Sequence, residues 1–194
     1  PVTIMYDLFF LKGSVAGIKQ NLQEMKKYGL YPIIRVTSYT GQAPGCPSAD
    51  CWIKLYDAGK VNEDITIMAQ HLSDALGAVT FPDKPIVTFM NEVNLHDNWQ
   101  GRSATAEFAK SFSEFYDAIK PGNAYVIFPA LSYGADGSNG ISPAQFMQGF
   151  FALNKFGATK KMAGVALNIY GEDYDSVSQQ FGEQTGAFDS YSDS

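Results

Sequence analysis

The chain has 194 residues, of which 45% are hydrophobic and 18% are charged, and its formal net charge is −6. This length and composition suit one globular domain with a sizeable core and exclude an intrinsically disordered chain. No apolar run approaches the roughly 20 residues that a membrane span needs, and no targeting signal is visible. No Lys or Arg follows Lys161, which argues against a nucleic-acid partner, because such binding depends on basic side chains.

Short apolar runs alternate along the chain with longer segments of helical spacing. We expect strands over residues 2–6, 31–36, 85–90, 124–128 and 163–170, which are apolar and bounded by turn-forming residues. Four helices are expected between them, from Ser14 to Gly29, from Asn62 to Leu76, from Ser103 to Ile119 and from Ser142 to Phe151. Their first residues are good N-caps, and Gly29 suits a helix end.

The alternation of strands and helices, with no hairpin signals, predicts an α/β fold with a parallel sheet. A doubly wound sheet that binds a nucleotide would show a Gly-rich phosphate turn, and neither GxGxxG nor GxxxxGKS/T occurs in the sequence. We therefore favour a (β/α)8 TIM-barrel-like fold. Such barrels have about 250 residues, so about five parallel strands and four helices predict an incomplete barrel. Residues 1–194 would form this single partial domain, with an acidic polar C-terminal segment over residues 171–194.

Two cysteines, Cys46 and Cys51, lie close together in a polar loop that is rich in Pro and Gly. One interpretation is a local disulfide, which would imply an oxidising compartment and therefore an extracellular or secreted protein. The other interpretation is a pair of free thiols. A metal site is not expected, because no second Cys or His pair completes a set of four ligands, and no organic cofactor is indicated.

Reactive side chains of a βα barrel lie where its strands end and its βα loops begin. Among the polar residues at these positions, Asn91 and Glu92 alone place a carboxylate beside a second polar group at the end of a fully apolar strand. Such a Glu is partly removed from water and is suited to donate a proton near neutral pH. The alternative is that Glu92 merely opens the following loop, or that it forms a buried salt bridge with Arg35.

The segment from Lys84 to Asn94, which contains Asn91 and Glu92, resembles the fourth strand of clan A glycoside hydrolases. Residues 31–36, which follow an amphipathic segment, resemble the third strand of that clan, and residues 167–170 resemble the sixth. The resemblance covers roughly strands 2 to 6 of the barrel. It implies a retaining β-glycosidase that acts on a β-linked poly- or oligosaccharide, with Glu92 as the acid/base.

The resemblance also implies roles for residues around Glu92. Asn91 and Asn168 would bind substrate, although the clan often has a His at the place of Asn168. Tyr170 would face the sugar and the nucleophile. Arg35 would orient a carboxylate, or alternatively pair with Glu92. Among the loop aromatics Tyr39, Trp52, Trp99 and Tyr133, Trp99 is the expected sugar platform, and its alternative is a structural plug.

A retaining glycosidase needs a second carboxylate about 5–5.5 Å from the first, and the clan supplies it from a Glu that ends the seventh strand. The polar sequence after Tyr170 predicts no such strand. We therefore expect a missing segment or a partner chain to complete the barrel, since an open sheet leaves strand edges unpaired. The alternative function is a non-catalytic carbohydrate-binding or structural protein on a barrel-like scaffold. A cofactor enzyme on an open sheet is a third interpretation, disfavoured by the absent phosphate loop.

Overall fold

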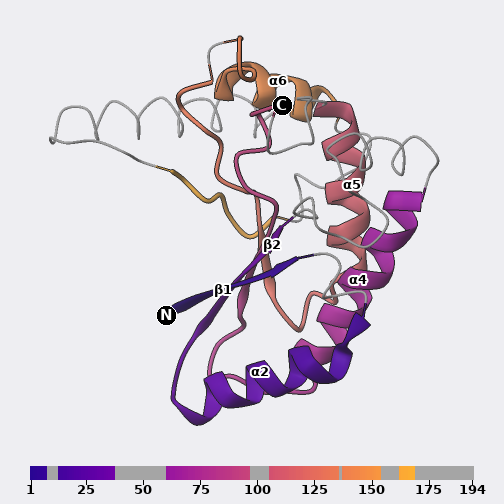
Figure 1. Cartoon of the computed structure of the whole chain (residues 1–194), viewed down its shortest axis with the longest axis vertical. Helices are drawn as coiled ribbons and strands as arrows, with labels where there is room; N and C mark the ends of the chain where they lie inside the picture. Colours follow the sequence, from indigo (N-terminus) through magenta and orange to yellow (C-terminus); the bar gives the residue numbers. More distant parts are fainter. Residues whose placement is uncertain (8–12, 38–59, 97–104, 136, 154–161, 169–194) are drawn as a thin grey trace, which may run out of the picture.

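The computed structural model describes residues 1–7, 13–37, 60–96, 105–135, 137–153 and 162–168 (Figure 1). These residues form four strands that alternate with four helices. In chain order the elements are β1 (Val2–Asp7), α2 (Val15–Lys27), β2 (Pro32–Thr37), α4 (Lys60–Gly77), β3 (Ile86–Phe89), α5 (Thr105–Ala118), β4 (Tyr125–Ile127) and α6 (Pro143–Ala152). Over this part of the chain the expected α/β fold is confirmed, and none of its helices is long and apolar enough to cross a bilayer.

The four strands form one parallel sheet in the order β1-β2-β3-β4. Aliphatic residues pair across neighbouring strands: the buried Ile34 of β2 lies between the partly buried Ile4 of β1 and the buried Val87 of β3. Val87 in turn pairs with Val126 of β4. The strands therefore stand side by side in the same order in which the chain makes them.

The predicted fifth strand is present as a short stretch of parallel pairing beside β4. Val165 forms a parallel bridge with Phe128. The N–H of Phe128 donates to the carbonyl of Gly164 at 2.9 Å, and the N–H of Ala166 donates to the carbonyl of Phe128 at 2.8 Å. Residues 163–166 thus extend the sheet in the same direction, although their pairing is too brief to form a regular strand.

The helices follow one another in the same order as the strands. α2 packs against α4, α4 against α5, and α5 against α6, and Figure 1 shows them as a continuous layer running around the strands. Parallel strands are joined by right-handed crossovers, so an order that advances in one direction puts every helix on the same face. Among the described strands the order does not reverse, as it would in a doubly wound sheet. This arrangement is compatible with part of a (β/α)8 barrel.

A cluster of phenylalanine rings joins β3 and the residue after β4 to the helices α5 and α6. Its members are Phe89, Phe108, Phe112, Phe115, Phe128, Phe146 and Phe150, and each is at most 3% exposed. Phe89 stacks on Phe115 with ring centroids 4.6 Å apart, and Phe128 meets Phe150 edge-on at 4.9 Å. Such offset and edge contacts add to the free energy gained by burying the rings. The cluster fixes β3, and β3 leads directly to Asn91 and Glu92.

Two predicted helix starts are confirmed. The Ser14 hydroxyl accepts a hydrogen bond from the N–H of Gly17 at 2.9 Å at the start of α2. The Ser142 hydroxyl accepts from the N–H of Gln145 at 3.3 Å, and Pro143 follows as the first residue of α6. Each cap satisfies one of the N–H groups that the first turn of a helix leaves without an intrahelical partner.

The predicted start at Asn62 is wrong, because α4 already begins at Lys60. The apolar spacing that identifies this helix starts only at Ile65, and the polar residues before it can adopt helical geometry without changing the pattern. A boundary inferred from such a pattern is uncertain by one or two residues. The predicted start of the next helix at Ser103 lies outside the described residues, and α5 is described from Thr105.

The end of α2 depends on a glycine. Gly29 has a φ of +66°, in the left-handed region that other residues adopt at a cost. Its N–H donates to the carbonyl of Lys26 at 3.0 Å, and the N–H of Leu30 donates to the carbonyl of Met25 at 2.9 Å. These are the two hydrogen bonds of a Schellman motif, as expected for a helix that ends in Tyr-Gly.

Replacing Gly29 by Ala is expected to lower the free energy of unfolding by about 1 kcal/mol, because the added Cβ is strained at a positive φ. The matched control is Gly122→Ala. Neither glycine has an atom within 4 Å of the added Cβ, and only Gly29 has a positive φ. Urea unfolding of both variants measures the difference, and equal stabilities would show that the backbone of Gly29 is not constrained.

Candidate active site

The carboxyl ends of the parallel strands bring together the segments that carry the predicted site residues. β3 ends at Phe89, three positions before Glu92. Residues 163–166 run parallel to β4, and Asn168 lies two positions after them. Because all these strands point the same way, their carboxyl ends meet at one edge of the sheet. Glu92 and Asn168 therefore come from segments on the two sides of β4.

The side chains of Glu92 and Asn168 are in direct contact. The Nδ2 group of Asn168 donates a hydrogen bond to Oε1 of Glu92, with 3.0 Å between the two atoms. Both residues are half-buried. An amide carries no charge and does not titrate, so Asn168 orients the carboxyl group without supplying or removing a proton. The structure thus brings these two predicted site residues into contact.

The backbone that leads to Glu92 has an unusual conformation. Met90 has a φ of 67° and Glu92 has a φ of 48°, values that residues other than Gly and Asn seldom adopt. Such strain costs about 1–3 kcal/mol per residue and persists only where the surroundings enforce it. The N–H of Met90 donates to the carbonyl of Val36 at 2.6 Å, and the N–H of Glu92 donates to the carbonyl of Ala130 at 2.7 Å. Bonds to both neighbouring chain segments therefore set the direction in which Glu92 leaves the sheet.

Asn94 also belongs to this region, although no pattern in the sequence singles it out. Its side chain is fully buried. Nδ2 donates to the carbonyls of Ser132 at 2.8 Å and Ile141 at 2.9 Å, and Oδ1 accepts from the N–H of Ser132 at 2.8 Å. These partners are 38 and 47 positions away. An asparagine in a polar loop is usually placed there for turn formation, so only the tertiary structure reveals its burial.

Two further predicted residues lie near Glu92 in the chain or in the sheet. Asn91 is half-buried. Arg35 is half-buried and lies in β2 opposite Thr88 of β3. Among the ion pairs of the described residues, none joins Arg35 to Glu92. The alternative of a structural salt bridge between these two residues therefore has no support in the described part of the chain.

Several predicted residues lie outside the described residues, namely Trp99, Tyr170, Cys46 and Cys51. The sugar platform, the terminal tyrosine and the disulfide therefore stay predictions. Tyr133, another candidate platform, is described and is 37% exposed. Within the described ranges, no group of three or more His, Cys, Asp or Glu side chains could hold a metal ion.

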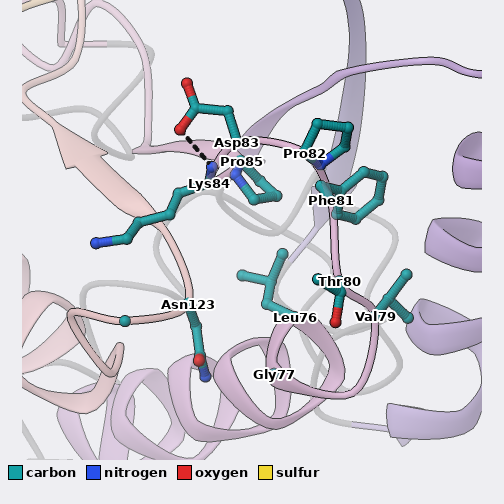
Figure 2. A pocket seen from close by; sticks show the side chains of 11 residues that line it. Leu76, Gly77, Val79, Thr80, Phe81, Pro82, Asp83, Lys84, Pro85 and Asn123 are labelled. Atoms are coloured by element: carbon teal, nitrogen blue, oxygen red, sulfur yellow. Dashed lines mark hydrogen bonds between the residues drawn. The ribbon is translucent and has the colours of Figure 1, made fainter.

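A pocket of about 400 Å³ lies near the opposite ends of the strands, where α4 ends and β3 and β4 begin (Figure 2). Its lining residues are Leu76, Gly77, Val79, Thr80, Phe81, Pro82, Asp83, Lys84, Pro85, Gly122 and Asn123. The Nζ of Lys84 donates to the carbonyl of Pro121 at 3.2 Å and lies over the ring of Tyr125. The Nδ2 of Asn123 donates to the carbonyl of Ser73 at 2.7 Å. These polar groups hold neighbouring segments together, so the pocket is a weaker candidate for chemistry than the edge that carries Glu92.

Comparison of the chain with protein-family models and with curated proteins found no match in either case.

Proposed function

We propose that this chain is part of a (β/α)8 barrel of the clan A glycoside hydrolase type, and that Glu92 is the acid/base of a retaining β-glycosidase. One observation carries the proposal. Glu92 follows a buried parallel strand at the carboxyl edge of the sheet, and Asn168 from the segment beyond β4 binds its carboxyl group at 3.0 Å. Reactive groups of barrel enzymes occupy this edge, and the neutral amide of Asn168 orients the carboxyl group without placing a charge beside it.

The order of the strands supports the barrel. β1, β2, β3, β4 and residues 163–166 lie side by side in chain order, and they would correspond to strands two to six. A barrel also requires that all helices lie on the outer face, which agrees with the succession of α2, α4, α5 and α6. The remaining strands would come from a further segment or from a partner chain.

The chemistry of Glu92 would have two steps. Glu92 first gives its proton to the oxygen of the leaving group, while a second carboxylate attacks the anomeric carbon and forms a glycosyl-enzyme. Glu92 then takes a proton from the water that hydrolyses this intermediate. The second carboxylate would follow a seventh strand, which is not among the described strands. Asn91, Arg35, Trp99 and Tyr170 would bind and orient the sugar.

A carbohydrate fits the charge of the chain. The formal net charge is −6, and no basic residue follows Lys161. An acidic protein attracts a neutral ligand as readily as a basic protein does, whereas it repels polyanions. The charge therefore agrees with a neutral carbohydrate, and the resemblance to clan A glycoside hydrolases leads us to propose a β-linked poly- or oligosaccharide as the substrate class.

The proposal is tested by incubating the full-length protein with a panel of β-linked and α-linked polysaccharides and oligosaccharides. We expect cleavage of a β-linked member, and NMR of the first products should show the β anomer. Release of the α anomer would exclude the retaining mechanism. Binding without cleavage would instead support the second candidate, a non-catalytic carbohydrate-binding protein.

A further inference from the structure

The segment that carries Glu92 is attached to the segment that follows β4. We call this attachment the Asn94 contact, and we define it by Asn94, Ser132, Gly140 and Ile141. Besides the three side-chain hydrogen bonds of Asn94, the N–H of Ile141 donates to the main-chain carbonyl of Asn94 at 2.9 Å. The main chain and the side chain of Asn94 together therefore bind Ser132 and Ile141, at the two ends of the neighbouring segment.

Close approach of the two backbones requires the glycine at position 140. A Cβ built on Gly140 would lie 2.2 Å from the carbonyl oxygen of Asn94. Beside this point Leu95 and Gly140 form an antiparallel bridge, and the N–H of His96 donates to the carbonyl of Asn139 at 2.8 Å. The two segments thus pair over several residues, and no side chain fits between them at Gly140.

The Asn94 contact acts on the backbone of Glu92. Asn94 is two positions from Glu92, and Ser132 is two positions from Ala130, whose carbonyl accepts from the N–H of Glu92 at 2.7 Å. The two attachments form a closed loop of contacts around the residue whose φ is 48°. A left-handed backbone persists only where its surroundings enforce it. Loss of the Asn94 side chain would therefore allow the backbone of Glu92 to leave this conformation.

We propose that Asn94 is a positioning residue for Glu92. By joining residues 92–96 to residues 130–141, it maintains the backbone conformation of Glu92 and keeps the carboxyl group in contact with Asn168. The assignment of a reaction to that carboxyl group rests on the proposed function, whereas the geometric part of the inference does not.

The test uses Asn94→Asp and Asn94→Ala in the full-length protein. The Asp variant is nearly isosteric, but it sets a carboxylate against the carbonyl oxygens of Ser132 and Ile141. We expect kcat to fall about 10–100-fold with little change in KM, because a small displacement of a reacting group has effects of this size. The NMR signals of the Glu92 carboxyl carbon and of the Asn168 side-chain amide should shift.

Asn139→Asp is the matched control. Asn139 lies in the same segment, is exposed, and its side chain donates a long bond of 3.4 Å to the carbonyl of Gly134. The Asn139→Asp variant should leave kcat and the NMR signals of Glu92 and Asn168 unchanged. Asn94 variants that lose stability but keep the Glu92 and Asn168 signals and kcat would overturn the inference, since Asn94 would then be a structural residue only.

If neither Asn94 variant folds, hydrogen exchange of the unchanged protein tests whether Asn94 positions Glu92. The N–H groups of Glu92, Ser132 and Ile141 should exchange together, within a factor of about three, because one opening event exposes them. Exchange of Glu92 about 100-fold faster than the other two would overturn the inference. If the protein hydrolyses no glycoside at all, the proposed function fails, and the NMR and exchange measurements still decide the role of Asn94.

Discussion

Replacing Glu92 by Gln is expected to lower kcat for an unactivated β-linked oligosaccharide by about 10²–10⁴-fold, the usual contribution of a general acid/base. Gln keeps the size of the side chain and can still contact Asn168, so the affinity for the oligosaccharide should change little. Aryl glycosides with good leaving groups need no protonation, and their first step should be nearly unaffected. Steady-state kinetics with both substrate types and calorimetric binding of the oligosaccharide measure these effects.

Glu107→Gln is the control for this variant. Glu107 is also a half-buried carboxylate, and it lies in the first turn of α5, away from the contact with Asn168. Its loss should affect stability slightly through the helix dipole and leave kcat unchanged. A fall of less than about tenfold in kcat for Glu92→Gln would contradict the assignment of Glu92 as the acid/base.

Replacing Phe108 by Ala is expected to have the largest effect on stability, a loss of about 3–5 kcal/mol in the free energy of unfolding. Its side chain is fully buried. The ring contacts those of Phe89, Phe112, Phe128, Phe146 and Phe150, with centroids between 5.6 and 6.3 Å apart. Removing the ring leaves a cavity among rigid side chains that cannot close it, and the lost contacts add to the lost hydrophobic free energy.

Urea unfolding measures this loss as a lower midpoint at an unchanged m-value. The control is Tyr28→Ala, because the Tyr28 side chain is 67% exposed and its described aromatic contact is with Lys27. This control should cost about 1 kcal/mol or less. Equal losses in the two variants would show that the phenylalanine cluster is not the core that fixes β3.

Much of the fold could be predicted from the sequence because its elements follow local patterns. In α2 the buried residues Ile18, Leu22 and Met25 recur at helical spacing, and Ser14 and Gly29 mark its ends. The apolar runs of β2 and β3 likewise predict strands that are covered by helices. The start of α4 was misplaced because polar residues at a helix terminus carry no periodic signal.

The site could be predicted only in part. The place of Glu92 after an apolar strand and the resemblance of residues 167–170 to a sixth barrel strand identify Glu92 and Asn168. Their hydrogen bond, however, depends on the register of β3, β4 and residues 163–166. Asn94 was not identified, because its burial arises from partners in another loop. The positive φ of Glu92 was not predictable either, since it contradicts the local preference of Glu and results from tertiary hydrogen bonds.

The central claim is that Glu92 serves a retaining enzyme as its acid/base, and rescue of Glu92→Ala by azide tests it most directly. In this variant of the full-length protein an activated aryl β-glycoside should form the glycosyl-enzyme, and azide should attack it without needing a general base. We expect azide to restore turnover, with a β-glycosyl azide as the product identified by NMR. An α-glycosyl azide, or turnover that azide does not change, would contradict the claim.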